Sequence, residues 1–306
     1  MRAAVVVEAG RATLTEVDPP EPQADEVRLR IEGCGVCGSD LPLFQGRPWF
    51  EYPREPGAPG HEGWGIVEKI GSGVAGLRPG TRVAALSYRA YSDFDVASAD
   101  AVVPLPSALD GVPFPGEALG CAVNVFRRSD VHPGQRVAVV GVGFLGALLV
   151  QLADRAGAEV LAVSRRDAAL DVARAMGASA TRSLGEGDFE ECDRVIEAAG
   201  RQETLDAAAR MTGTRGRLVI AGFHQDGERT VDMQMWNWKG LDVVNAHERD
   251  PRTYVEGMRE AVRLVAEGEL DPSPLYTHVF PLDRIEAALT AATARDDGFM
   301  KALVMP

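Results

Sequence analysis

A glycine-rich turn follows an apolar run near the middle of the chain. Residues 137–140 read V-A-V-V, and residues 141–146 continue as G-V-G-F-L-G before an apolar helical run. In this pattern the first glycine permits a tight turn, the second lets the backbone approach a pyrophosphate, and the third allows close helix–strand packing. The N–H groups that open such a helix attract phosphate. The sequence therefore predicts a dinucleotide site formed by Gly141, Gly143, Phe144, Leu145 and Gly146.

The end of the next apolar run, residues 159–163, distinguishes between the two nicotinamide dinucleotides. An NAD site usually has Asp or Glu there to bond the ribose 2′-hydroxyl, whereas this chain has Ser164, Arg165 and Arg166. Arginine holds a 2′-phosphate through charge-assisted, bidentate hydrogen bonds, and a carboxylate would repel it. We therefore expect NADP(H) to be preferred over NAD(H). The alternative is that these arginines form only the solvated entry of a helix that Asp167 caps.

Three segments ahead of the glycine turn contain Cys, His and Glu: residues 33–40 (G-C-G-V-C-G-S-D), 59–63 (P-G-H-E-G) and 116–121 (G-E-A-L-G-C). In this order before a dinucleotide fingerprint, they resemble the zinc-dependent medium-chain dehydrogenases/reductases, which include alcohol, sorbitol and threonine dehydrogenases. The resemblance covers nearly the whole chain, including E-A-A-G at 197–200. It implies an α/β protein with a doubly wound Rossmann sheet and a mostly-β GroES-like catalytic domain. It also implies cofactor contacts at Ala198 and Gly222.

The resemblance further implies one catalytic zinc ion held by Cys37, His61 and Glu117. Glu117 occupies the third-ligand position of the polyol-dehydrogenase branch, and its distance from the glycine turn favours it over Cys121. A thiolate, an imidazole and a carboxylate with one open position meet the needs of catalytic zinc. The ion would act as a Lewis acid while the nicotinamide ring exchanges a hydride with an alcohol or carbonyl substrate.

The same resemblance gives roles to three neighbouring side chains. Asp40 would hold the other ring nitrogen of His61, as ligating histidines require. Glu62 would be a carboxylate behind the ligands, or an alternate ligand when the site is empty. Ser39 would bond the substrate oxygen and pass its proton onward.

The chain departs from the family pattern in two places. Residues 79–83 (P-G-T-R-V) lead straight into A-A-L-S-Y, and no cysteine follows before Cys121, although larger relatives carry a four-cysteine structural-zinc loop there. We therefore expect one metal ion per chain. Leu41 and Pro42 follow Asp40, where many relatives have a histidine that ends a proton relay. Proline cannot carry protons, so water or the cofactor ribose must complete the relay.

The substrate is only broadly indicated. Residues 44–52 (F-Q-G-R-P-W-F-E-Y) lie between two ligand segments, and their aromatic rings suit a hydrophobic or ring-shaped substrate. Packing of these rings against a neighbouring subunit or domain is an equal alternative. We expect a secondary alcohol or ketone of polyol, cyclitol or sugar-like type. Rival hypotheses are a zinc-free quinone or enone reductase of the same superfamily and a non-catalytic NADPH-binding protein.

Two kinds of domain must position these residues, since 306 residues exceed one typical core. Up to residue 123 short β-type runs alternate with Gly and Pro turns, which is an all-β pattern. From residue 124 apolar strands alternate with helical segments, which predicts a parallel sheet covered on both faces. The tail returns to the first style. We therefore expect a catalytic domain at 1–123 and 273–306, and a dinucleotide domain at 124–272.

Charge and composition exclude several partners. A formal net charge of −13 argues against nucleic acid and anionic membranes, because both need concentrated Lys and Arg. No 18-residue apolar run and no signal peptide occur, and four cysteines are too few for a disulfide scaffold. We expect a cytoplasmic enzyme acting on a small molecule, with edge strands compatible with a homodimer or homotetramer.

Overall fold

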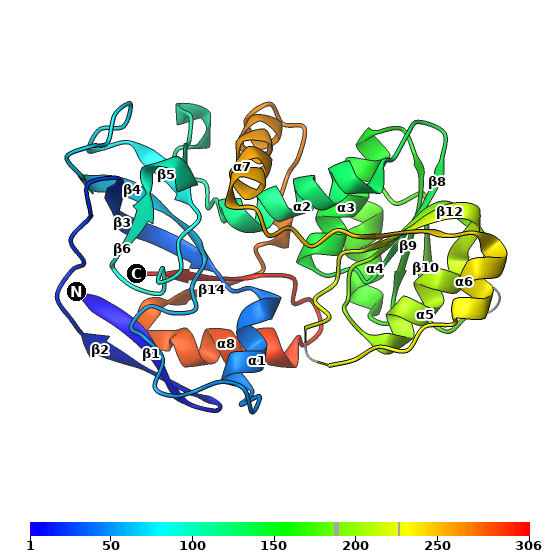
Figure 1. Ribbon diagram of the computed structural model, residues 1–306, viewed down its shortest axis with the longest axis horizontal. Helices are drawn as coiled ribbons and strands as arrows, with labels where there is room; N and C mark the ends of the chain where they lie inside the picture. Colours follow the sequence, from blue (N-terminus) through cyan, green and yellow to red (C-terminus); the bar gives the residue numbers. More distant parts are fainter. Residues whose placement is uncertain (187–189, 226) are drawn as a thin grey trace. The chain divides into compact units, whose positions relative to one another are not determined.

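The chain folds into two compact units, which we describe separately. A computed structural model describes residues 1–186, 190–225 and 227–306. One unit comprises Met1–Gly120 with Asp250–Pro306, and the other comprises Cys121–Arg249. The mixed α/β fold class with a Rossmann sheet is confirmed (Figure 1).

The second unit contains a parallel sheet of six strands in the order β10-β9-β8-β11-β12-β13. The strands are β8 (Arg136–Val140), β9 (Glu159–Ser164), β10 (Ala180–Ser183), β11 (Cys192–Glu197), β12 (Thr212–Ile220) and β13 (Asp242–Asn245). The run 137–140 is fully buried, as expected for a parallel sheet covered on both faces. Strand order reverses at β8, whose neighbours are β9 and β11, and ligands of such sheets bind at this reversal.

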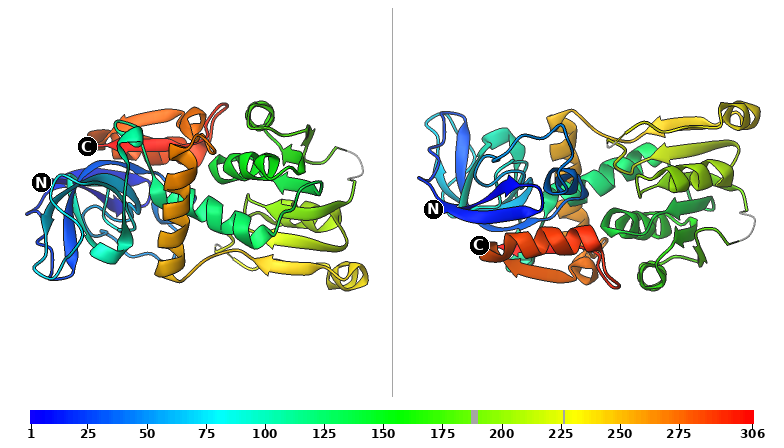
Figure 2. Two further views of the ribbon diagram at one scale, coloured as in Figure 1. Left: turned by 90° about the horizontal axis from the view of Figure 1, so that it is seen from above. Right: turned by 90° about the horizontal axis from the view of Figure 1, so that it is seen from below.

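Helices connect these strands. They are α3 (Phe144–Arg155), α4 (Asp167–Ala175), α5 (Gln202–Met211) and α6 (Met233–Lys239), while α2 (Gly116–Ser129) leads into the unit. Helices α3 and α4 pack on β8, β9 and β10, whereas α5 packs on β8, β11 and β12 (Figure 2). Helices α3, α4 and α5 therefore bury an apolar face against the sheet, and Leu205, Met211 and Leu218 belong to the resulting core.

The first unit is mostly antiparallel β-structure. Its main sheet runs β14-β15-β3-β4-β5-β7, with β6 paired to β3, and β1 pairs with β2 separately. The strands are β1 (Arg2–Glu8), β2 (Arg11–Glu16), β3 (Glu26–Gly35), β4 (Glu62–Ile70), β5 (Arg82–Ala85), β6 (Phe94–Ser98), β7 (Val102–Pro104), β14 (His278–Pro281) and β15 (Ala302–Met305). The helices are α1 (Leu41–Phe44), α7 (Pro251–Ala266) and α8 (Ile285–Ala294). In β3, Val27, Leu29 and Ile31 are buried, so alternate residues face the core.

The C-terminal strand of the chain pairs with a strand from its N-terminal part. Strand β15 runs antiparallel to β3, with Val304 opposite Cys34. On the other side of β3, Gly35 lies opposite Glu62, the first residue of β4. These three strand ends therefore bring residues from the beginning and the end of the chain together.

The boundary between the units differs from the expected one. The second unit ends at Arg249, whereas the sequence pattern suggested residue 272. Helix α7 accounts for the difference, because it contacts β7 and the 3-10 turn Ala99–Ala101 of the first unit. A helical pattern alone does not reveal which sheet the helix covers. Among the described residues, no helix is long and apolar enough to cross a membrane.

The close approach of β3 to β4 predicts that Gly35→Ala destabilises the protein. A Cβ at this position would collide with the Glu62 carboxylate and the Lys301 side chain. Such overpacking costs about 1–3 kcal/mol, which urea unfolding followed by circular dichroism would measure. Gly38→Ala is the matched control, because the nearest atom to its Cβ would be Arg295 Nη2 at 3.5 Å. Equal losses in the two variants would contradict the assignment of strain to Gly35.

Candidate metal and dinucleotide site

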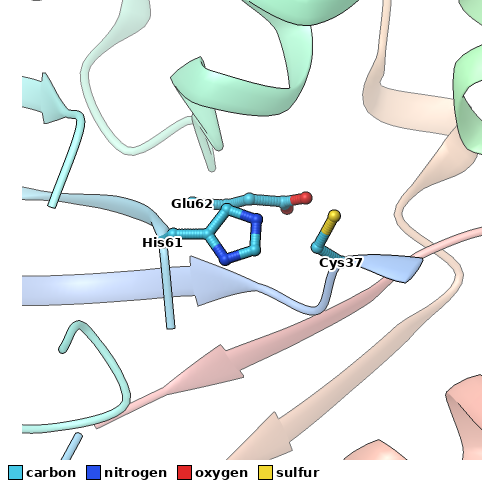
Figure 3. Close-up of side chains that lie close together, drawn as sticks. All are labelled: Cys37, His61 and Glu62. Carbon is cyan, nitrogen blue, oxygen red and sulfur yellow. The ribbon is translucent and has the colours of Figure 1, made fainter. Parts of the chain in front are cut away.

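A group of three metal-binding side chains lies where β3 ends and β4 begins. Cys37 follows β3, His61 immediately precedes β4, and Glu62 is the first residue of β4. Their sulfur, nitrogen and oxygen ligand atoms all lie within 4.8 Å of one another. Figure 3 shows the Glu62 carboxylate and one ring nitrogen of His61 turned toward the sulfur of Cys37. Soft and borderline donors so close together are suited to one divalent ion such as zinc.

Hydrogen bonding fixes the orientation of His61. Nδ1 lies 2.9 Å from the carbonyl oxygen of Pro59, which can only accept, so Nδ1 carries the ring proton. Asp40 Oδ1 lies 3.3 Å from the same nitrogen. In the neutral ring the lone pair therefore lies on Nε2, which faces Ser39 Oγ at 3.4 Å. Ser39 in turn donates to Cys37 Sγ at 3.2 Å. His61 is therefore held in the tautomer that a metal requires.

Asp40 is buried and is held by groups other than His61. Its Oδ2 accepts hydrogen bonds from the Cys37 backbone N–H at 3.0 Å and from the Tyr91 hydroxyl at 2.6 Å. Burial, together with the negative charge of Asp40, raises the pKa of Tyr91 well above its usual value. The phenol thus keeps its proton and donates a hydrogen bond to Asp40. Nothing in the sequence marks Tyr91, because it lies in a segment without a motif.

Lys301 neutralises Glu62 inside the protein. Its Nζ lies 2.7 Å from Glu62 Oε1, and the two side chains are only 5% and 2% exposed. Burial opposes protonation of the lysine, but the Glu62 charge outweighs it, so the pKa of Lys301 is raised. Breaking such a buried pair leaves one charge uncompensated. The only sequence signal for this role is a single lysine within the apolar run 299–304.

The two cysteines of the C-x-x-C segment have different environments. Cys34 is fully buried, and burial with the nearby Glu62 charge raises the pKa of its thiol well above the usual value. Cys37 is partly exposed and faces His61. Burial lowers the pKa of His61, but the charges of Asp40 and Cys37 reverse this effect and raise it well above its usual value. Cys37 is therefore the thiol suited to bind a metal, and neither cysteine forms a disulfide.

Glu117, the expected third metal ligand, does not belong to the close group that contains Cys37 and His61. It lies in the first turn of α2 and is 7% exposed. Among the described residues, the close group consists of Cys37, His61 and Glu62 and does not include Glu117. Glu62 joins this group because it adjoins His61 on β4 and is held by Lys301. The predicted third ligand thus remains a prediction, with Glu62 as a second carboxylate nearby.

The glycine turn of the second unit has the shape of a phosphate cradle. Gly141 has φ +101°, and a Cβ there would collide with Ala199, while a Cβ on Gly146 would collide with the carbonyl oxygen of Gly141. No atom lies within 4 Å of a Cβ built on Gly143, which caps α3. The backbone at Gly143, Phe144 and Leu145 therefore lies open to a ligand at a helix N-terminus.

Glu197 ties together the loops that follow β11 and β12. Its Oε1 accepts from the N–H groups of Ala199 at 2.9 Å and Gly200 at 2.8 Å, and from Thr204 Oγ1 at 2.7 Å. Its Oε2 lies 2.8 Å from His224 Nε2. Burial raises the pKa of Glu197, but these hydrogen bonds outweigh it, so its pKa is lowered. A Cβ on Gly222 would strike this carboxylate and Gly200, so the two loops are in direct contact.

The residues expected to select the dinucleotide lie at the end of β9. Ser164 is buried and its Oγ accepts from the N–H of Arg166 at 3.2 Å. The Arg166 side chain reaches the carbonyl oxygen of Val142 in the glycine turn at 3.2 Å. Arg165 instead points to α5, where it pairs with Glu203. The two arginines therefore flank the turn from different directions.

Comparisons with known proteins give a consistent result. Residues 23–107 match the alcohol dehydrogenase GroES-like domain, and residues 145–267 match the zinc-binding dehydrogenase family. A 2-dehydro-3-deoxy-L-galactonate 5-dehydrogenase of Pseudoalteromonas atlantica is 26% identical over 92% of each chain. An alcohol dehydrogenase of a Moraxella species is 31% identical over 72% of this chain and 77% of its own. A zinc-binding dehydrogenase of Sinorhizobium meliloti, whose structure contains NADP, superposes with a TM-score of 0.87 at 26% identity and covers 100% of this chain and 99% of its own.

The Glu197 network predicts a pH-dependent contribution to stability. Glu197→Gln should lower the free energy of unfolding at pH 7 by about 1–3 kcal/mol, since charge-assisted hydrogen bonds are lost. Because the folded-state pKa is below the usual value of 4.5, this stabilisation is complete above that value and disappears as pH falls through the folded-state pKa.

Urea unfolding of wild type and variant between pH 3 and pH 7, roughly the range in which this carboxyl titrates, would measure the difference. Glu159→Gln is the control, because Glu159 is 63% exposed and lies 3.7 Å from Arg136. A difference between wild type and Glu197→Gln that stays constant with pH would contradict the lowered pKa.

Proposed function

The chain belongs to the zinc-dependent medium-chain dehydrogenases/reductases, which are oxidoreductases acting on CH–OH groups, and we propose that it transfers a hydride between NADP(H) and a secondary alcohol or ketone with the help of one zinc ion. The observation that carries the proposal is the grouping of Cys37, His61 and Glu62 within 4.8 Å. This grouping also disfavours a zinc-free quinone or enone reductase, because such an enzyme has no use for clustered metal donors.

The donor set fits a catalytic zinc site. Cys37 and His61 would supply sulfur and nitrogen, and Glu117 would complete the site as the family pattern implies, with Glu62 as the nearby alternate carboxylate. In its neutral form His61 would direct the lone pair of Nε2 toward the side of Ser39 and the metal donors, because Nδ1 is bonded to Pro59. When bound, the ion supplies Lewis-acid polarisation of the substrate oxygen. We propose one ion per chain, because the four-cysteine structural-zinc loop of larger relatives has no counterpart after residues 79–83.

The remaining side chains have roles that follow from their contacts. Ser39 lies between Cys37 Sγ and His61 Nε2, so its hydroxyl can accept the proton of a substrate alcohol. Asp40 holds His61 and is itself held by Tyr91. Lys301 pairs with Glu62 in a buried position. Pro42 cannot relay the proton further, so the proton must leave through water or the cofactor ribose.

The cofactor proposal depends on the second unit. The open backbone at Gly143 would bind the pyrophosphate, and Ala198 and Gly222 would border the dinucleotide at the same sheet edge. Arg165 and Arg166, in place of an acidic residue, favour a 2′-phosphate. The Sinorhizobium meliloti structure, which contains NADP, supports this preference.

The substrate is proposed to be a polyol-, cyclitol- or sugar-like alcohol. The Pseudoalteromonas atlantica relative, named for a deoxy sugar acid, supports this class. In the first unit, Trp49 is 54% exposed and its ring centroid lies 6.0 Å from that of Phe50. An exposed indole in the loop between the two ligand segments offers a flat surface on which a sugar ring can stack.

Metal analysis tests the proposed centre. Wild-type protein should contain about one zinc per chain, and Cys37→Ser should lose most of it, because thiolate is the strongest donor of the set. Glu117→Gln should weaken zinc binding by more than about tenfold, whereas Glu62→Gln should have a smaller effect. Elemental analysis and competition with a chromophoric chelator would measure both.

Cys121→Ser is the matched control for the loss of a thiol and should keep its zinc. A greater loss in Glu62→Gln than in Glu117→Gln would assign the third ligand to Glu62. A wild-type protein that binds no zinc would overturn the proposal.

Cofactor preference is tested by steady-state kinetics with a secondary alcohol or ketone substrate. We expect kcat/KM to be about tenfold higher for NADPH than for NADH, the effect of about one charge-assisted interaction. Arg165→Met should lower the NADPH value by about tenfold and leave the NADH value within about twofold. Arg174→Met, which removes an arginine paired with Asp171 on the exposed face of α4, should change neither. A clear NADH preference would refute this part of the proposal.

A further inference from the structure

A hollow lies at the carboxyl edge of the parallel sheet in the second unit. Its volume is about 490 Å³, and it is lined by Arg165, Arg201, Gln202, Glu203 and Asp206. The hollow is shallow and open to solvent, so it could hold only the exposed end of a ligand that is bound elsewhere. The lining comes from two places in the sheet, because Arg165 follows β9 and the other residues open α5 after β11.

The hollow is adjacent to the glycine turn. Strands β9 and β11 are the two neighbours of β8, which ends at Val140 just before Gly141, and all three run parallel. Their carboxyl ends therefore share one edge of the sheet, where the strand order reverses. A dinucleotide whose pyrophosphate lies on the turn must extend its adenosine half along this edge, past the end of β9.

The charged groups in the hollow are not equivalent. Asp206 Oδ1 accepts from Gln202 Nε2 at 2.8 Å, and Gln202 also bonds the backbone of Thr230. Glu203 instead pairs with Arg165, at 2.7 Å from Nη1 to Oε1. The side chain of Arg165 is 55% exposed and that of Glu203 is 49% exposed. Exposed ion pairs are weak, so Arg165 has a partner that another anion can displace.

We propose that Glu203 is a specificity-determining residue, a displaceable counter-ion that competes with the cofactor 2′-phosphate for Arg165. The inference rests on the NADP(H) preference proposed above. A phosphate monoester carries about −1.5 to −2 charges at pH 7 and three acceptor oxygens, so it outcompetes a single carboxylate. When the ribose carries a hydroxyl, Glu203 stays on Arg165 and neutralises it.

The position of Glu203 suits this role. It lies in the first turn of α5, where the helix dipole stabilises a carboxylate even after its partner has turned away. Glu203 thus moderates the preference for NADP(H) and keeps the site usable for NAD(H). A sequence search at the end of β9 misses this residue, because the acidic group comes from a different strand–helix connection.

The test measures binding directly, with 2′,5′-ADP and 5′-ADP as probes in isothermal titration calorimetry of the full chain. Glu203→Gln should bind 2′,5′-ADP about two- to fivefold more tightly, the factor that corresponds to one exposed ion pair. Its affinity for 5′-ADP should change less than about twofold. The gain should decrease at higher salt, since the competing charges are exposed.

Asp206→Asn is the matched control, because it removes the same charge from the same hollow without touching Arg165. It should leave both affinities within about twofold. In the double variant Arg165→Met/Glu203→Gln, the gain from Glu203→Gln should vanish, which isolates the pairwise interaction. Thermal unfolding would establish that every variant is folded.

The inference is overturned if Glu203→Gln leaves 2′,5′-ADP binding unchanged, or if Asp206→Asn increases it equally, which would indicate only the general field of the hollow. A wild-type protein that binds 5′-ADP as tightly as 2′,5′-ADP would instead refute the proposed NADP(H) preference. In that case a selective gain in Glu203→Gln would still support the counter-ion role, so the two failures can be told apart.

Discussion

The candidate metal centre depends on one constraint, which is that every charge buried in the first unit must have a partner. Asp40 and Glu62 are each 1% exposed, and a carboxylate in such a position is tolerated only when it is neutralised and hydrogen-bonded. Asp40 meets this condition with His61, Tyr91 and a backbone N–H, and Glu62 meets it with Lys301. These same pairings orient the donor atoms, so stability and chemistry have a common origin here.

The second unit follows the same rule with different residues. Glu197 is fully buried, and it is satisfied by two N–H groups, a hydroxyl and an imidazole. Arg229 Nε donates to His224 Nδ1 at 3.1 Å, so the imidazole proton lies on Nε2 and points to Glu197. The loops that border the dinucleotide edge are thereby rigid on the protein side. The exposed pair Arg165–Glu203 is held more weakly than these buried groups.

Local patterns predicted much of this molecule. The glycine turn, the apolar parallel strands and the Cys and His segments are encoded in short stretches, since each requires particular residues at fixed spacing. Tyr91 and Lys301 could not be found in this way, because their roles depend on strand pairings between distant segments. The same reason explains the boundary at Arg249 and the position of Glu62 next to Cys37. Which carboxylate approaches a metal depends on tertiary packing. The sequence pattern of α7 likewise does not indicate which sheet the helix packs against.

The pairing of β15 with β3 has a consequence for how the protein is made. Lys301 follows Glu62 by 239 positions, and the entire second unit lies between them. During synthesis from the N-terminus, the parallel sheet is therefore complete before the first unit can acquire its last strand. Until then the main sheet of the first unit lacks β15 beside the end of β3, and Glu62 lacks its partner Lys301. The second unit is in effect an insertion within the first, so the residues around Glu62 can be completed only after the last strand has been synthesised.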